Sequence, residues 1–529
     1  MNILAVSLQK ALDRLAAWPR LGALGLGVLA ATGFPPLAAW PITLIAMAGL
    51  GWLVWNAQSA KRAAKLGWLF GIGHFTFANS WIATAFTYQT EMPAALGWIA
   101  VPLLSLYLAV YPALAAALTK WLTGSHRGWS AFALAFAGSW TISEWLRSWV
   151  FTGYAWDPLG LTMLGGFARP GAAMILPWTG TYALSGMVVG IGIALLGLLL
   201  SRRWIAAALG AAILATMMYW PAPAQRQGTL AFTLVQPDVR QDELNDASQF
   251  EAQFLHAASL SMKRDDALKR LLLWPESGVP DYLRDGYPQR YYNQMTAAGD
   301  PQFARFRLGQ VAGEGGMLLT GAVDLEIRDG RAYGARNAVT ALNSDGKIVA
   351  GYDKAHLVPY GEYLALRWLL EPLGASRLVA GSIDFLPGPG PQTLQLGDWG
   401  KAGVQICYEI IFSGEVVDRA NRPDYIFNPS NDGWFGAWGP PQHLGQARMR
   451  AIEEGLPVLR ATTTGISAVI DANGVVRKYI PMHQAARIDG IVPPAKPPTP
   501  FASLGNWLAL GWALAGILLS LVATRFRRS

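Results

Sequence analysis

Residues 403–412 read Gly-Val-Gln-Ile-Cys-Tyr-Glu-Ile-Ile-Phe, and this apolar, strand-like run holds Cys407, the single cysteine of the 529-residue chain. One cysteine cannot form an intramolecular disulfide, so Cys407 is either an inert buried thiol or a reactive one. Composition alone favours the inert thiol. Glu409 lies two residues later, however, and a carboxylate in an apolar strand is costly unless a partner offsets its burial. A base and a cation from elsewhere in the chain would explain both residues.

The composition predicts a membrane protein that carries one folded insert. The chain is 52% hydrophobic and only 14% charged, whereas soluble domains are about 25% charged. Residues 226–492 have an ordinary globular composition, and the segments on either side of them are strongly apolar. We therefore expect a helical transmembrane domain of about seven spans at residues 1–225, an extracytoplasmic domain at 226–492, and a Pro-rich linker with a last transmembrane helix at 493–529.

Spans of about 20 apolar residues are the units that cross a bilayer as helices. Candidates begin near Leu21, Leu37, Leu66, Met92, Trp129, Ala172, Trp204 and Leu504. The first two are short and interrupted by Gly33, Pro35 and Pro36, so the choice between seven and eight spans stays open.

The positive charges predict how these spans are oriented, because short cytoplasmic loops are rich in Lys and Arg. With a cytoplasmic N-terminus, the cytoplasmic segments hold Lys10, Arg14, Arg20, Lys61, Arg62, Lys65, Lys120, Arg127, Arg202, Arg203, Arg525, Arg527 and Arg528, and the main exception outside is Arg169. Both termini are then cytoplasmic, and residues 226–492 lie on the other side of the membrane. Glu144 and Arg147 share a helix face in the fifth span, where their role is either packing or function.

The segment 226–492 alternates strand-like and helix-like patterns, as an α/β domain does. Strands are expected at 229–236, 271–274, 317–327, 337–342, 348–352, 424–428 and 467–470, and helices at 247–260, 301–313 and 442–454. The sequence Asn343-Ser-Asp-Gly346 predicts a hairpin turn between two of these strands.

Three polar residues stand where apolar strand-like runs end: Glu276, Lys354 and Cys407. Active sites of open α/β sheets assemble at strand ends. A thiolate that attacks a carbonyl, a carboxylate that removes the thiol proton and an ammonium that stabilises the oxyanion are the groups that acyl transfer through a thioester requires. Spacing alone does not establish that the three residues converge.

Motifs of other chemistries are absent from the sequence. It contains no Gly-x-Ser-x-Gly elbow, Walker loop, Gly-x-Gly-x-x-Gly fingerprint or His-Glu-x-x-His pair, and its six histidines lack ligand spacing. We expect neither a metal ion nor a cofactor.

The motifs around the three polar residues resemble those of the nitrilase, or carbon-nitrogen hydrolase, superfamily. They are Trp-Pro-Glu276-Ser, Tyr-Asp-Lys354-Ala-His-Leu-Val-Pro-Tyr-Gly-Glu362-Tyr and Ile-Cys407-Tyr-Glu. Together with the membrane spans, Phe151-Thr-Gly-Tyr-Ala-Trp156, Asn428-Pro-Ser-Asn-Asp-Gly-Trp-Phe-Gly436, residues 442–453 and Arg460-Ala-Thr-Thr-Thr-Gly-Ile-Ser, they resemble the bacterial apolipoprotein N-acyltransferases over nearly the whole chain.

This resemblance implies an αββα sandwich for the insert and a role for each matching residue. Glu276 is implied as general base, Lys354 as the cation that stabilises the tetrahedral intermediate, and Cys407 as nucleophile. Supporting roles are implied for Glu362, Tyr408 and Glu409, and substrate contacts for Trp156, Asn337, Asn431 and Trp434. A lysine-rich site would then offset the burial of Glu409.

The resemblance also implies the reaction and its place in the cell. A fatty acyl chain would pass from a glycerophospholipid to Cys407 and then to the α-amine of the diacylglyceryl-cysteine of an apolipoprotein, with the catalytic domain on the periplasmic side of the inner membrane. The alternative is a membrane-tethered amidase that hydrolyses its acyl-enzyme with water. A non-catalytic transporter or scaffold is less favoured, because its membrane part offers one evident charge pair.

Overall fold

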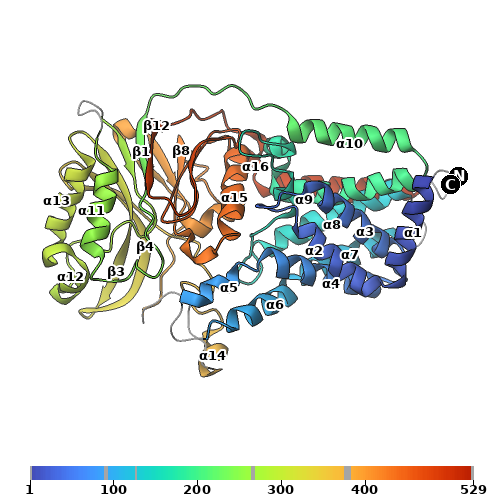
Figure 1. Ribbon diagram of the computed structural model, residues 1–529, viewed down its shortest axis with the longest axis horizontal. Helices are drawn as coiled ribbons and strands as arrows, with labels where there is room; N and C mark the ends of the chain where they lie inside the picture. The colour runs from blue at the N-terminus through green and yellow to red at the C-terminus, as the bar shows by residue number, and fades with distance from the viewer. Residues whose placement is uncertain (1–2, 89–92, 125–127, 264–268, 374–382, 526–529) are drawn as a thin grey trace. The chain divides into compact units, whose positions relative to one another are not determined.

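The computed structural model describes residues 3–88, 93–124, 128–263, 269–373 and 383–525 (Figure 1). The chain divides into two compact units. The helical unit comprises Met1–Ala83, Ala95–Ala222 and Pro498–Ser529, and the α/β unit comprises Thr84–Ala94 and Pro223–Pro497.

The helical unit is built from apolar helices joined mostly by short loops. Its helices are α1 (Ile3–Ala17), α2 (Pro19–Ala31), α3 (Trp40–Trp55), α4 (Ala60–Ala78), α6 (Leu96–Leu108), α7 (Val110–Thr123), α8 (Trp129–Arg147), α9 (Leu176–Leu200), α10 (Trp204–Tyr219), α16 (Pro500–Leu504) and α17 (Asn506–Arg525), and α5 (Ile82–Ala85) lies at its boundary. Short 3₁₀ turns η2 (Leu159–Met163) and η3 (Ala172–Ile175) precede α9.

Among the described residues, three helical stretches are long and apolar enough to cross a membrane: Leu96–Thr123, Ala172–Leu200 and Asn506–Thr524. Three shorter apolar helices accompany them, α2, α3 and α10. The membrane character expected from composition agrees with these helices, whereas a total of about eight spans is not established by them. The span expected near Met92 starts at Leu96 in the described part of the chain; Met92, Arg127, Arg527 and Arg528 lie outside the described residues.

Small residues allow close helix contacts in the helical unit. Gly27 on α2 faces the carbonyl group of Phe70 on α4, and Gly73 on α4 faces the carbonyl group of Leu24. A β-carbon at either glycine would overlap the facing backbone, so α2 and α4 can approach this closely only with glycine at the contact, as membrane helices often do.

Glu144 and Arg147 hold the loop that follows their own helix. Arg147 Nη1 donates to the carbonyl oxygen of Trp156 at 2.7 Å, and Glu144 Oε1 accepts from the backbone N–H of Leu159 at 3.0 Å. The two side chains are buried and lie 3.8 Å apart. They therefore hold the backbone on both sides of Asp157 and Pro158. Of the two roles that the sequence left open, packing and function, these contacts favour packing.

The α/β unit contains two six-stranded sheets. The first has the order β12-β1-β2-β3-β4-β5 and the second the order β11-β10-β9-β8-β7-β6. The strands are β1 (Ala231–Gln236), β2 (Leu271–Leu273), β3 (Met317–Arg328), β4 (Arg331–Asn343), β5 (Ile348–Asp353), β6 (Thr393–Gln395), β7 (Lys401–Val404), β8 (Tyr425–Ser430), β9 (Val458–Thr462), β10 (Ser467–Ile470), β11 (Val476–Ile480) and β12 (Ala486–Ile491). Strands β1, β2 and β3 run parallel, and so do β7, β8 and β9.

Helices cover the two sheets on their outer sides (Figure 1). Helices α11 (Phe250–Leu260), α12 (Gln289–Met295) and α13 (Pro301–Ala312) accompany the first sheet, and α15 (Gly439–Glu454) packs on the second. Leu272, Trp274, Leu308 and Leu318 are among the fully buried residues of the core beneath α11 and α13. The side chain of Gln236 on β1 accepts a hydrogen bond from the backbone N–H of Ser467 on β10 and so links the sheets. This is the αββα arrangement that the resemblance implied.

The strands and helices expected between residues 229 and 470 are confirmed, including the hairpin turn between β4 and β5. The expectation for residues 403–412 is wrong in one respect. Strand β7 ends at Val404, and Cys407–Ile411 form a 3₁₀ turn, η7. The apolar pattern reflects burial on all sides, which periodicity cannot distinguish from a strand.

Candidate active site

The expected site residues stand beyond the ends of strands from both sheets. Glu276 follows β2, Lys354 follows β5, Cys407 follows β7, and Asn431 follows β8. Because the parallel strands of a sheet bring their carboxyl ends to one edge, this placement gathers the residues in space. All four are buried.

A buried cation bridges two carboxylates at the centre of the site. Lys354 Nζ donates to Glu362 Oε1 at 3.0 Å and lies 3.4 Å from Glu276 Oε1. Asn337 Nδ2 donates to the same two oxygens, at 2.7 Å for Glu276 and 2.9 Å for Glu362. The backbone N–H of Asn431 donates to Glu276 Oε2 at 2.7 Å. Every oxygen of Glu276 thus has a donor, as a buried carboxylate requires.

Opposing effects set the protonation states of the cation and the thiol. Burial alone would lower the pKa of Lys354, but Glu362, Glu276 and Cys407 outweigh it and raise that pKa, so the side chain stays an ammonium. Burial raises the pKa of Cys407 well above its ordinary value, the charge of Glu276 raises it further, and Lys354 lowers it. The resting thiol is therefore protonated and needs a base to become a nucleophile.

Glu409 connects the segment before the nucleophile to the lysine loop. Its Oε2 accepts from the backbone N–H of Ile406 at 2.7 Å, and its Oε1 accepts from the Tyr352 hydroxyl at 2.7 Å and from the N–H groups of Ala355 and His356 at 2.8 and 3.1 Å. Burial nevertheless raises the pKa of Glu409 to about 7. Lysine was expected to offset this burial. The charge of Lys354 does lower the pKa of Glu409, but the direct donors to its carboxylate are three backbone amides and a phenol.

Tyr408 lies against the same connection through an aromatic contact. Its ring meets the edge of Phe412 at a centroid distance of 5.2 Å, and Phe412 stacks on His356 at 3.8 Å. Burial and the charge of Lys354 lower the pKa of His356 to about 4, so its ring is neutral at physiological pH. Tyr408 therefore packs beside Cys407, and its neighbour Glu409 bonds to the segment that follows Lys354.

The four residues expected to contact substrate lie in different settings. The amide of Asn337 binds the two carboxylates, and the side chain of Asn431 bonds to Gln241 and Thr463, so both side chains already have partners within the protein. Trp434, in the turn η8 (Asp432–Phe435), is partly exposed and meets the ring of Tyr88 edge-on at 5.9 Å.

Trp156, the fourth of these residues, belongs to the helical unit. Its side chain is buried, and its ring packs against Trp81 at a centroid distance of 4.7 Å.

A second buried cluster beside the nucleophile was missed by the sequence argument. His443 Nε2 lies 3.0 Å from the carbonyl oxygen of Cys407, and His443 Nδ1 lies 3.0 Å from Asp432 Oδ1. Arg460 Nη2 donates to both oxygens of Asp432, at 2.8 and 2.7 Å. Asp432, His443 and Arg460 all belong to the motifs quoted from the sequence, but the motifs do not indicate that these three side chains contact one another.

Within the described residues, Cys407, Asp432 and His443 also form the group of potential metal ligands, with ligand atoms all within 4.8 Å of one another. The carboxylate of Asp432 is engaged by Arg460, and both ring nitrogens of His443 have partners within the protein. A cation beside Arg460 would also be repelled. These residues do not fit a metal site.

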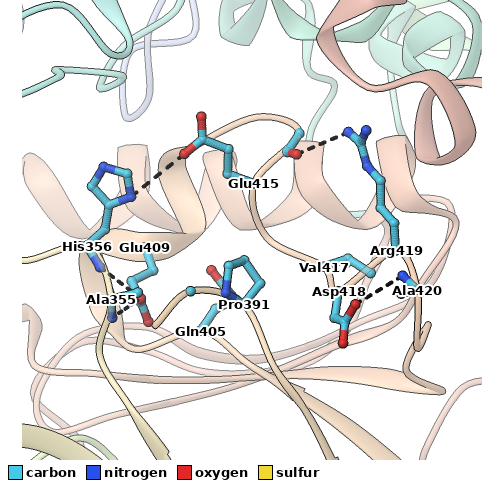
Figure 2. A pocket seen from close by; sticks show the side chains of 12 residues that line it. Ala355, His356, Pro391, Gln405, Glu409, Glu415, Val417, Asp418, Arg419 and Ala420 are labelled. Carbon is cyan, nitrogen blue, oxygen red and sulfur yellow. Dashed lines mark hydrogen bonds and ion pairs between the residues drawn. The ribbon is translucent and has the colours of Figure 1, made fainter. Parts of the chain in front are cut away.

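Glu409 also lines a cavity of about 570 Å³ (Figure 2). Its lining includes Ala355, His356, Gln405 and Glu415, and none of Glu276, Lys354 or Cys407 lines it. Figure 2 shows His356 and Glu415 turned toward each other across its rim.

Comparisons with known proteins match both parts of the chain. The family described as "Apolipoprotein N-acyltransferase N-terminal domain" matches residues 26–194, and the family described as "Carbon-nitrogen hydrolase" matches residues 233–481.

Similar proteins cover almost the full length. An apolipoprotein N-acyltransferase of Rhodopseudomonas palustris is 33% identical over 96% of this chain and 95% of its own length. One of Bradyrhizobium diazoefficiens is 33% identical over 95% of each chain, and one of Methylococcus capsulatus is 32% identical over 95% of each. Among solved structures, a nitrilase-superfamily protein of Saccharomyces cerevisiae covers 51% of this chain and 92% of its own, with a TM-score of 0.36 and 19% identity.

Proposed function

The chain belongs to the apolipoprotein N-acyltransferase family, and on this premise we propose that it moves a fatty acyl chain from a glycerophospholipid to the N-terminal diacylglyceryl-cysteine of an apolipoprotein. The observation that carries the proposal is the buried cluster in which Lys354 bridges Glu276 and Glu362 beside the protonated thiol of Cys407.

The first step forms a thioester. Glu276 takes the proton of the Cys407 thiol as the sulfur attacks the ester carbonyl carbon of the phospholipid, and the oxyanion that develops is stabilised by the ammonium of Lys354. The tetrahedral intermediate collapses by breaking the ester C–O bond. Glu276 returns the proton to the departing oxygen, and a lysophospholipid leaves.

The second step forms an amide and regenerates the thiol. The α-amine of the diacylglyceryl-cysteine attacks the thioester carbonyl, again beside Lys354, and loses a proton to Glu276. The C–S bond then breaks, the thiolate takes the proton from Glu276, and the triacylated product leaves. Glu362, Asn337 and Glu409 hold these groups in place and exchange no proton with the substrate.

The proposed topology places the α/β unit on the periplasmic side of the inner membrane and both termini in the cytoplasm. Its support is the distribution of Lys and Arg along the chain. We propose domains at residues 1–225, 226–492 and 493–529, and the changes between compact units at Ala222/Pro223 and Pro497/Pro498 support boundaries near these positions. Alkaline phosphatase fused after residue 226 should be active, and the same enzyme fused after residue 203 should be inactive.

The reaction is tested with purified protein and a phospholipid that carries a labelled acyl chain. The parent protein should acquire a label that hydroxylamine removes, and the Cys407→Ser variant should acquire none that hydroxylamine removes. A label that never appears on the parent protein would exclude the thioester.

An acceptor distinguishes the transferase from the amidase. After addition of a diacylglyceryl lipopeptide, the transferase should move the label to the peptide amine, whereas an amidase should release free fatty acid at the same rate with or without the peptide.

A further inference from the structure

The backbone at Cys407 adopts a conformation that a residue with a side chain seldom takes. Its φ angle is +49°, in the left-handed region, where a β-carbon is crowded and glycine is favoured. Glycine cannot replace Cys407, because the thiol is required. Such a conformation persists only where the surrounding structure holds it. The contacts on either side of Cys407 therefore bear on how its Sγ is aimed.

One of these contacts comes from His443 on α15. Its Nε2 lies 3.0 Å from the carbonyl oxygen of Cys407. A carbonyl oxygen only accepts hydrogen bonds, so Nε2 must carry the hydrogen. The imidazole thus fixes the peptide group that directly follows the nucleophile.

The other ring nitrogen shows which tautomer is present. His443 Nδ1 lies 3.0 Å from both Arg460 Nη2 and Asp432 Oδ1. Burial and the charge of Arg460 lower the pKa of His443, so its ring is neutral. A neutral ring with its hydrogen on Nε2 has a lone pair on Nδ1, and this lone pair accepts from Arg460.

Arg460 is itself held from several sides. It donates to both oxygens of Asp432, to Ser430 Oγ at 3.0 Å, and to the side chain of Asn428. All of these residues are buried. These contacts hold the planar guanidinium in place, and the two N–H groups of its Nη2 are shared among the Asp432 oxygens and His443 Nδ1.

Arg460 also balances a charge beside the nucleophile. A carboxylate oxygen of Asp432 lies within 4.8 Å of Cys407 Sγ. An unpaired carboxylate at this distance would oppose formation of the thiolate. The ion pair with Arg460 offsets part of this charge, so that Asp432 adds less to the raised pKa of Cys407 than burial and Glu276 do.

We propose that His443 is a positioning residue for the nucleophile: its Nε2–H holds the carbonyl oxygen of Cys407, and the Asp432–Arg460 pair keeps the imidazole in the orientation and tautomer that this hydrogen bond requires. The inference rests on the proposed function for the role of the thiol, but not for the identity of the acyl donor.

The test compares two substitutions of the same residue. His443→Gln keeps an N–H donor and an acceptor oxygen at the end of a side chain of similar reach, whereas His443→Leu keeps the volume and removes both. His256→Leu is the matched control, because His256 is an exposed histidine of the same unit.

Two reactions of the full-length protein are measured. The burst of acylation by a p-nitrophenyl ester requires an aligned sulfur and does not depend on the natural donor. Alkylation by iodoacetamide at one fixed pH, followed by intact mass, reports the accessibility and ionisation of the single thiol and does not require its alignment with an ester. The melting temperature of each variant is recorded in the same detergent.

We expect His443→Leu to slow the acylation burst about 100-fold, the effect of misplacing a reacting atom by about 1 Å. Alkylation and the melting temperature should stay close to those of the parent protein, and His443→Gln should recover most of the burst rate. Full activity in His443→Leu, or equal losses in the Gln and Leu variants, would overturn the inference.

A rise in alkylation that matches the loss of acylation in His443→Leu would also overturn it, because the substitution would then have unfolded the site. If the parent protein shows the burst but takes no acyl chain from phospholipid, the proposed function fails while the comparison of the variants still tests His443.

Discussion

Replacing Lys354 with methionine removes the charge that separates two buried carboxylates. Lys354 Nζ lies 3.0 Å from Glu362 Oε1 and 3.4 Å from Glu276 Oε1. At an effective dielectric constant of about 20, each contact is a gross attraction of about 5 kcal/mol, and most of it compensates for the desolvation of the buried ammonium. Breaking one partner of a buried ion pair lowers the unfolding free energy by about 3–5 kcal/mol, and we expect a loss of this size for Lys354→Met at pH 8.

This loss should depend on pH. In Lys354→Met, Glu276 and Glu362 still share the amide of Asn337, but no cation lies between them. Their repulsion is relieved when one of them takes up a proton, so the variant regains stability as the pH falls. We expect the deficit relative to the parent protein to be smaller at pH 5 than at pH 8.

Unfolding of the full chain in detergent, followed by tryptophan fluorescence at pH 5 and pH 8, measures the deficit. The double variant Lys354→Met/Glu362→Gln should restore part of it at pH 8, because only one carboxylate remains charged. Lys347→Met is the control, since an exposed lysine should change stability by less than about 0.5 kcal/mol. An equal deficit at the two pH values, or no recovery in the double variant, would refute the assignment of Lys354 as the counter-charge of both acids.

Three further outcomes follow from the site. Glu276→Gln removes a charge that raises the pKa of Cys407, so the pH profile of iodoacetamide alkylation should move to lower pH. Acyl-enzyme formation should fall about 100- to 10,000-fold, because the general base is lost. An unmoved alkylation profile would contradict the electrostatic effect of Glu276 on Cys407. The raised pKa of Glu409, about 7, makes its ionisation unfavourable to folding, so the parent protein should lose about 2.5 kcal/mol relative to Glu409→Gln between pH 5 and pH 8. Urea unfolding of both proteins measures this loss, and a constant difference between them would argue against it. Asn337→Leu leaves Glu276 and Glu362 one donor short and should cost about 1–3 kcal/mol in unfolding free energy, whereas unchanged stability would mean that water replaces the amide.

The backbone of the site follows from local sequence signals. Glu276, Lys354 and Cys407 each stand just beyond an apolar run, and the runs are strands β2, β5 and β7. A sequence predicts strands and turns well, because both depend on residues that are close together in the chain. The two-sheet arrangement came from the resemblance, because strand order depends on contacts between distant segments.

The hydrogen-bond network of the site could not be predicted in the same way. Glu409 receives its donors from Tyr352 and from backbone groups 53 and 54 residues away in the chain, and backbone N–H groups leave no trace in a sequence. The left-handed conformation of Cys407 could not be predicted from the sequence either. A glycine usually indicates such a conformation, but the proposed chemistry requires a thiol at this position. The sequence therefore predicted the contribution of lysine to the stabilisation of Glu409, which Lys354 makes through its charge, but not the hydrogen bonds from backbone amides and Tyr352.

The raised pKa of Cys407 keeps the thiol protonated before the reaction. A thiolate held permanently beside Lys354 would react readily with oxidants, because thiolate character sets how readily a cysteine is oxidised. Here burial and the nearby carboxylates keep the proton on the sulfur. In the proposed mechanism the thiolate forms only as Glu276 removes the proton, and negative charge passes on to a carbonyl oxygen beside Lys354. The low dielectric constant of the site suppresses the free thiolate. It also strengthens the interaction between the ammonium and the oxyanion, which the acyl-transfer transition state requires.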